Sequence, residues 1–187
     1  MSRRVFTAHT ADTAPAAARP TVAGVQKRFG YLPAPVALMA ESPQLLQGFL
    51  SANSIFESGS LDPLEREVVV LTVATRNECH VCVAMHTPTL ARHGGTPELV
   101  EALRAAAPLP DPRLEALRRF TLAVLDHAGA VPDDELHAFL DAGYQPRHAL
   151  DVVLGVGTYT ISTFANRLTD APLDPPLAAY AWGPAAA

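Results

Sequence analysis

The chain has 187 residues, of which 49% are apolar and 18% are charged, as is typical of one globular domain and not of a disordered chain. Fourteen basic and nineteen acidic residues give a net charge of −5, which argues against binding to nucleic acid or an anionic membrane, since both need a basic surface. Two cysteines are too few for a disulfide-stapled scaffold, and no apolar run reaches the roughly 18 residues of a membrane span.

Residues 1–19 are predicted to form a flexible N-terminal arm rich in Ala, Pro and Thr. Arg3 and Arg4 resemble the start of a twin-arginine export signal, but such a signal needs an apolar stretch behind it. The residues from Thr7 to Asp12 are mixed and weakly polar. We therefore expect a cytoplasmic protein.

Residues 20–172 are predicted to form one all-α domain, a compact multi-helix bundle whose helix starts are marked by proline. Proline is favoured at the first helical position, with Ser, Thr or Asp just before it. Such pairs occur at Ser42-Pro43, Asp62-Pro63, Thr96-Pro97 and Asp111-Pro112. No alternating strands separated by two-residue turns are visible. In chain order, the predicted helices cover residues 21–29, 43–58, 63–76, 79–93, 97–107, 112–129, 132–142 and 146–168.

The last predicted helix contains Gly155 and Gly157, where glycine costs up to about 1 kcal/mol each. Close approach of another helix, or a subunit contact, would explain these glycines. Tyr159 and Phe164 in the same helix could line the pocket of a site, but their helical spacing favours a place in the core. Residues 173–187 are predicted to form an extended C-terminal arm, whose Trp182 packs on the body or on a neighbouring subunit.

Both cysteines, Cys79 and Cys82, lie at the predicted start of the helix 79–93. The positive end of a helix dipole lowers the pKa of a thiol and favours the thiolate. Spacing of three residues places both sulfurs on one helix face, close enough to form a disulfide. His86 follows one turn later on that face, where an imidazole can take the thiol proton directly or through one water.

Glu67 lies on the preceding predicted helix, twelve residues before Cys79. If the helices 63–76 and 79–93 form an antiparallel hairpin, Glu67 lies roughly 12 Å before the turn and His86 roughly 10 Å after it. The two side chains would then face each other at one level, and a carboxylate orients an imidazole. The pattern predicts a proton relay from Glu67 through His86 to the dithiol.

The two cysteines have other possible roles. A c-type haem site needs His directly after the second cysteine, where Val83 stands here. A zinc site needs four ligands, of which Cys79, Cys82 and His86 supply three, with His80 or Glu67 as a fourth. A thioredoxin fold would place the two cysteines in a βαβ unit, and no such unit is visible. Two unrelated buried cysteines would not explain why His86 and Glu67 stand at matching positions. We expect no cofactor and no metal.

The order Glu67, eleven residues, Cys79-x-x-Cys82, three residues and His86 resembles the core of the alkylhydroperoxidase D-like, or carboxymuconolactone decarboxylase, family. Gly30–Pro33 followed by Ser42–Leu46 resembles the lead-in of its peroxidase-related members. The segment from Asn166 to Asp174 resembles their closing segment. The resemblance covers about residues 25–175.

This resemblance implies an all-α bundle assembled as a homotrimer or homohexamer. It implies a thiol-dependent peroxidase that reduces alkyl or hydrogen peroxide without haem or metal. By position, Cys82 would attack the peroxide, His86 and Glu67 would relay protons, and Cys79 would close a Cys79–Cys82 disulfide. An external thiol, whether a lipoyl group, a thioredoxin-like protein or a small thiol, would reduce that disulfide again.

Two questions stay open at this point. Helix position favours Cys79 as the more acidic thiol, whereas closeness to His86 favours Cys82 as the nucleophile, and we follow the relay. Members acting as lactone decarboxylases generally lack the dithiol, so Cys79 and Cys82 favour redox chemistry. A carboxymuconolactone decarboxylase-like lyase and a non-catalytic redox or metal sensor are the alternatives.

Overall fold

A computed structural model describes residues 5–183, so that residues 1–4 of the predicted N-terminal arm and 184–187 of the C-terminal arm lie outside the described residues. Within 5–183 there is no strand, and the all-α prediction is confirmed. The elements are α1 (Arg19–Phe29), α2 (Ala34–Met39), α3 (Pro43–Glu57), α4 (Pro63–Arg76), α5 (His80–Arg92), α6 (Pro97–Arg104), α7 (Pro112–Asp126), α8 (Asp133–Asp141), α9 (Pro146–Thr169) and the 3-10 helix η1 (Pro175–Tyr180).

The predicted helix starts are confirmed by their caps. Asp62 accepts the backbone N–H of Glu65, and the Glu65 carboxylate accepts the backbone N–H of Asp62, so that α4 begins with a capping box. Ser42, Thr96 and Asp111 likewise accept backbone N–H groups at the starts of α3, α6 and α7.

One helix was not predicted, and two predicted helices extend too far at their C-terminal ends. The short helix α2 was not predicted, because its six residues, one of them Pro35, carry too little periodicity. α6 and α7 each end three residues early, since Ala106 and Ala128 take left-handed φ angles of 53° and 50°. Alanine carries no sequence signal for such a stop, which is normally marked by glycine.

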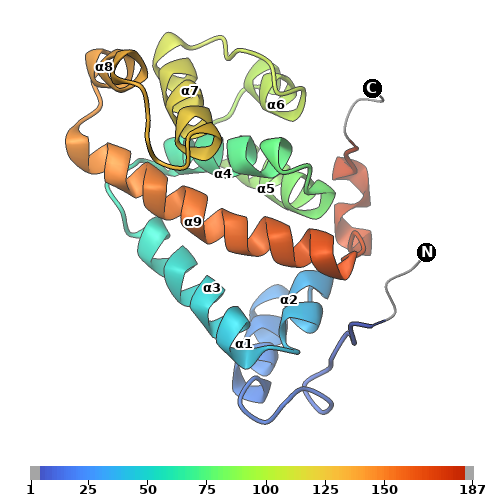
Figure 1. Cartoon of the computed structure of the whole chain (residues 1–187). Coiled ribbons are helices and arrows are strands. Elements are labelled where there is room, and N and C mark those ends of the chain that lie inside the picture. The colour runs from blue at the N-terminus through green and yellow to red at the C-terminus, as the bar shows by residue number, and fades with distance from the viewer. Residues whose placement is uncertain (1–4, 184–187) are drawn as a thin grey trace.

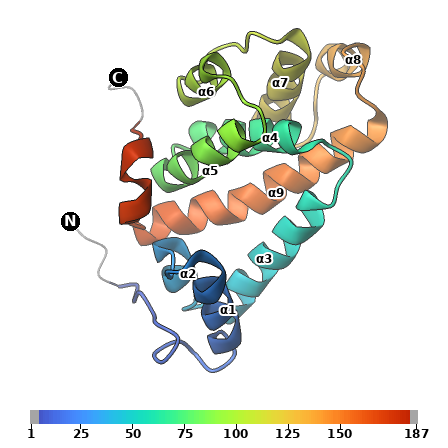
Figure 2. The same ribbon diagram turned by 180° about the vertical axis from the view of Figure 1, so that it is seen from behind.

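The long helix α9 crosses the molecule between two groups of helices (Figures 1 and 2). α1, α2 and α3 lie on one side of it, and α4 to α8 lie on the other. α4 packs against α5, α7 and α9 and is buried along most of its length. Each side has its own apolar cluster, the larger around α4 and the smaller around Val22, Met39 and Leu46.

Both ends of the described chain are tied to the body. The backbone N–H of His9 donates to the carbonyl of Ala37 at 3.0 Å. At the other end η1 packs on α5, and the indole of Trp182 donates to the Arg104 carbonyl at 2.8 Å. Trp182 therefore packs on the body of its own chain. No helix between residues 5 and 183 combines the length and the apolar character needed to cross a membrane.

The two glycines of α9 differ in their surroundings, which yields a matched pair of substitutions. A Cβ on Gly155 would lie 2.7 and 2.8 Å from atoms of the buried Phe56 ring, whereas a Cβ on Gly157 would meet no described atom within 4 Å. We expect Gly155→Ala to destabilise the fold by about 1–3 kcal/mol. Gly157→Ala should stabilise it by about 0.5–1 kcal/mol, because alanine favours the helix.

Urea unfolding of both variants checks this expectation. Opposite signs support a close helix approach at Gly155 and open space at Gly157. Equal effects of the two substitutions would contradict the packing described here.

Candidate active site

The turn between α4 and α5 places both cysteines. The N–H of Glu78 donates to the Thr75 carbonyl at 3.0 Å and that of Cys79 to the Ala74 carbonyl at 2.9 Å, the bonds of a Schellman motif. Glu78 holds the left-handed φ of 51° at a position where glycine is usual. Cys79 closes α4 in this way and is also the N-cap of α5, so that its thiol stands at the helix N-terminus.

The two thiols are free, buried and in contact. Their sulfurs lie 3.0 Å apart, and Cys79 is 1% exposed and Cys82 3%. Spacing of three residues across the first turn of α5 produces this contact, as the sequence predicted. The pair is therefore placed so that a proton, or a disulfide bond, can be exchanged between its members.

The two sulfurs differ in acidity. The hydrogen bond from the Cys82 thiol, aided by the backbone N–H groups of Cys82 and Val81, outweighs burial and lowers the pKa of Cys79 from 9.0 to about 7. The same shared proton, together with burial, raises the pKa of Cys82. The hydrogen bond from Cys82, aided by the backbone N–H groups at the start of α5, thus favours the first thiolate on Cys79.

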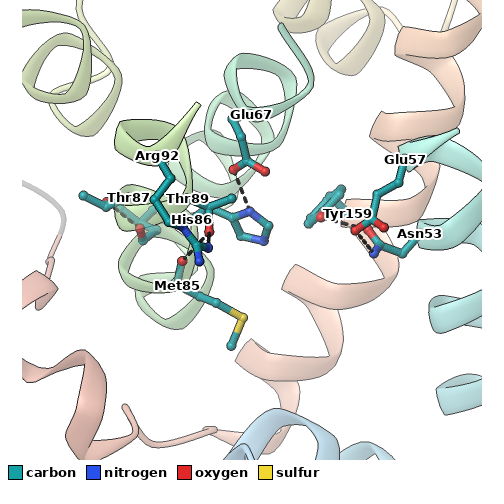
Figure 3. A network of polar contacts seen from close by, with 10 residues as sticks. Asn53, Glu57, Glu67, Met85, His86, Thr87, Thr89, Arg92 and Tyr159 are labelled. Carbon is teal, nitrogen blue, oxygen red and sulfur yellow. Dashed lines mark hydrogen bonds and ion pairs between the residues drawn. The ribbon is translucent and has the colours of Figure 1, made fainter. Parts of the chain in front are cut away.

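Glu67 and His86 meet across the α4–α5 hairpin, as the rise per residue predicted. Nδ1 of His86 lies 2.8 Å from Oε2 of Glu67, and the side chains are only 15% and 11% exposed (Figure 3). An ionised carboxylate only accepts, so Nδ1–H is the donor and Nε2 is left to exchange protons. Among residues 5–183, no hydrogen bond joins His86 to either sulfur.

Tyr159 of α9 lies beside His86, on another side of the ring from Glu67 (Figure 3). The two rings pack edge to face with centroids 5.1 Å apart, and the tyrosine hydroxyl donates to Oδ1 of Asn53 at 2.9 Å. Asn53 in turn donates to Glu57. Tyr159 is buried as predicted, and burial raises the pKa of its hydroxyl. Phe164, also expected in the core, is 59% exposed, so that prediction is wrong.

A cavity of about 950 Å³ lies where the two groups of helices meet. Cys82, Glu67, His86 and Tyr159 line it, whereas Cys79 does not. A molecule in this cavity can therefore contact the Cys82 sulfur and the His86 imidazole together. Most of the remaining lining is apolar or aromatic and comes from Val25, Phe29, Pro33, Pro35, Val36, Met39, Phe49, Leu50, Phe56, Pro63, Val70, Val81 and Met85.

Two further polar side chains reach the thiols from α9, and sequence reasoning missed both as site residues. Nδ2 of Asn166 lies 3.3 Å from the Cys82 sulfur and 3.8 Å from that of Cys79. The Ser162 hydroxyl lies 3.6 Å from the Cys82 sulfur. Both residues line the cavity. Asn166 stood only at the start of the segment resembling the family's closing segment, and no local pattern marked Ser162.

The side chains weighed as zinc ligands do not gather into a ligand set. Within the described residues, no group of three or more His, Cys, Asp or Glu side chains is arranged to hold a metal ion. Glu67 and His86 instead pair with each other, and Cys79 pairs with Cys82.

The fold has clear counterparts among solved structures. A peroxidase-related protein from Ralstonia eutropha JMP134 with an alkylhydroperoxidase AhpD core superposes with a TM-score of 0.80 at 20% identity, covering 92% of this chain and 93% of that one. A peroxidase-related protein from Silicibacter sp. TM1040 gives 0.74 at 20% identity, covering 92% and 94%. The debrominase Bmp8, in a complex with 2,3,4-tribromopyrrole, gives 0.70 at 14% identity, covering 96% of each chain.

The match by sequence covers a shorter part of the chain than the structural matches do. Residues 43–123 match the model of the carboxymuconolactone decarboxylase family, a stretch that contains the whole α4–α5 hairpin. No curated protein sequence matches significantly. Residues 43–123 thus match the carboxymuconolactone decarboxylase family, and the chain shares its fold with structures of peroxidase-related proteins, one with an alkylhydroperoxidase AhpD core.

Proposed function

We propose that the protein is a dithiol peroxidase that reduces organic hydroperoxides or hydrogen peroxide. One observation carries the proposal: the Cys82 sulfur, 3.0 Å from that of Cys79, lines the same cavity as the Glu67–His86 pair. Nucleophile, second thiol and proton relay are then available to one bound molecule. Thiols and a proton relay are what the reduction of an O–O bond requires.

The reaction has two steps. The Cys82 thiolate attacks the terminal oxygen of ROOH, the O–O bond breaks, and the leaving RO⁻ takes a proton from Nε2 of His86, giving ROH and Cys82–SOH. That proton comes from the Cys82 thiol: Nε2 of His86 takes it as the thiolate forms, and Glu67 stabilises the resulting imidazolium until the proton passes to RO⁻. Cys79 then attacks the sulfenic sulfur and releases water, leaving a Cys79–Cys82 disulfide. The sum is two thiols and ROOH giving a disulfide, ROH and water.

Reductive debromination is a second candidate, favoured by the apolar and aromatic lining of the cavity and by the fold shared with the debrominase Bmp8. The same dithiol would supply the two electrons. In that reaction a C–Br bond is replaced by C–H, and bromide and one proton are released as the disulfide forms.

The other two alternatives make different use of the cysteines. A lyase would need no thiol, and a non-catalytic sensor would be oxidised without turnover.

The test is a thiol count on the reduced, desalted protein before and after one equivalent of cumene hydroperoxide. Peroxidase action consumes both thiols, lowers the intact mass by about 2 Da and yields one equivalent of cumyl alcohol. A parallel sample with 2,3,4-tribromopyrrole reports debromination as released bromide. Thiols that stay free with the hydroperoxide would overturn the peroxidase proposal, and released bromide would then favour the second candidate.

Two features of the proposal rest on the family resemblance. The electron donor is a lipoyl group, a thioredoxin-like protein or a small thiol, and the assembly is a homotrimer or homohexamer. The proposed cytoplasmic location rests instead on the mixed, weakly polar residues that follow Arg3 and Arg4. Measuring multiple turnovers with dihydrolipoamide, reduced thioredoxin or glutathione distinguishes the three candidate electron donors.

A further inference from the structure

Helix α9 presents two polar side chains to the dithiol from a distant part of the chain. Ser162 and Asn166 are four residues apart, so they lie on one face of α9, directed toward Cys82. The Asn166 amide is the nearer, with Nδ2 at 3.3 Å from the Cys82 sulfur, and Asn166 is 3% exposed. An amide N–H at this distance donates to a thiolate and stabilises its negative charge.

The stability of the fold does not explain why residue 166 is an asparagine. Its Oδ1 is buried and has no hydrogen-bond partner among the described residues. A buried acceptor without a partner costs folding free energy, so an apolar side chain of similar size would suit the fold at least as well. The amide is accordingly explained by what its N–H groups do at the sulfurs.

Two influences compete for the charge of the singly ionised dithiol. The N-terminus of α5 favours the thiolate on Cys79, which does not line the cavity. Asn166 and Ser162 approach Cys82, which does line it. Because the sulfurs are 3.0 Å apart, a proton can pass from Cys82 to Cys79 and move the charge to the cavity.

We propose that Asn166 is a positioning residue that draws the negative charge of the dithiol onto Cys82, the sulfur that faces the cavity. The inference deepens the proposed function and rests on it for the identity of the nucleophile. The distribution of charge can nonetheless be measured without any peroxide, so the two claims can fail separately.

Other titratable groups around the cavity also affect the pKa values of the thiols, and they come from several elements. Glu67 on α4 and His86 on α5 are the pair already described, and Tyr159 lies on α9 beside them. Further along the lining are Arg28 of α1, Glu57 of α3, Arg66 of α4, Arg92 of α5 and His93. Because all of these are unchanged when Asn166 is replaced, a shift caused by that replacement reports the lost amide.

The experiment measures the pKa of each cysteine alone, with and without the amide. Cys79→Ser isolates Cys82, Cys82→Ser isolates Cys79, and each is combined with Asn166→Leu. Thiolate ultraviolet absorbance against pH gives the four values. We expect Asn166→Leu to raise the pKa of Cys82 by roughly one to two units, and that of Cys79, 3.8 Å away, by less than half as much. At pH 7, alkylation of Cys82 should slow at least about tenfold.

Thr158→Val is the matched control, since it removes a buried hydroxyl of α9 that donates to its own helix at Leu154. It should leave both pKa values unchanged, and Asn166→Leu should not lower the melting temperature. Asn166→Ala repeats the measurement if the leucine variant misfolds. Equal shifts at both cysteines, or none, would overturn the proposal. A selective shift in a protein that does not reduce peroxide would uphold it and reject the proposed function.

Discussion

Cys82→Ser is expected to abolish peroxide reduction, lowering the rate of the first step by at least about a thousandfold, because a serine hydroxyl is not ionised at neutral pH. Cys82 is the member of the dithiol that lines the cavity shared with His86. Stopped-flow mixing of the reduced variant with cumene hydroperoxide, followed by quantification of cumyl alcohol, measures the effect.

Cys79→Ser is the matched variant, because it removes the second thiol, 3.0 Å away, and keeps the first. It should release one equivalent of cumyl alcohol in a single burst and then stop, with Cys82 trapped as a sulfenic acid that reacts with dimedone. The reverse pattern, a burst with Cys82→Ser and none with Cys79→Ser, would reassign the nucleophile to Cys79. A lyase activity would survive replacement of both cysteines by serine, whereas dithiol-dependent peroxide reduction would not.

Glu67→Gln is expected to lower the rate of peroxide reduction by roughly a hundredfold, within the range of a positioned acid–base group. Glu67 holds Nδ1 of His86 at 2.8 Å in a site where both side chains are largely buried. A glutamine is neutral and offers an amide in place of one carboxylate oxygen, so it neither fixes the tautomer as firmly nor balances an imidazolium. Single-turnover kinetics at saturating hydroperoxide isolates this effect from substrate binding.

Glu57→Gln provides the control for charge. Glu57 also lines the cavity, but it is exposed and its contact is with Asn53, away from His86. Its replacement should change the rate by less than about threefold. His86→Gln should match Glu67→Gln, and the double variant should be no slower than either alone, because the two act as one unit. Additive losses would show that Glu67 and His86 work independently.

Local signals in the sequence were sufficient for much of the fold. Proline after Ser, Thr or Asp predicted the starts of α3, α4, α6 and α7, because caps depend on neighbouring residues alone. Stops at Ala106 and Ala128, and the left-handed turn at Glu78, were not predictable, since these residues carry no preference for a positive φ. At each of these positions the backbone hydrogen bonds are those of a Schellman motif, which forms here without the glycine that usually marks it.

The tertiary structure decided which apolar side chains of α9 lie in the protein interior and which are exposed. Tyr159 and Phe164 share one helix and an apolar character, yet the first lines the cavity beside His86 and the second is 59% exposed. Helical spacing gives relative directions around an axis, but the direction of the core depends on which helices pack against α9.

The sequence by itself determined the all-α class, the dithiol at the start of a helix and the meeting of Glu67 with His86. These follow from rise per residue, helix periodicity and one tight hairpin, all of which act over short stretches of chain. Only the tertiary structure decided that Cys82 lines the cavity and Cys79 does not, and that Asn166 lies 3.3 Å from a sulfur 84 residues earlier in the chain. Contacts at such separation depend on how α9 packs between the two groups of helices, and no local pattern records that packing.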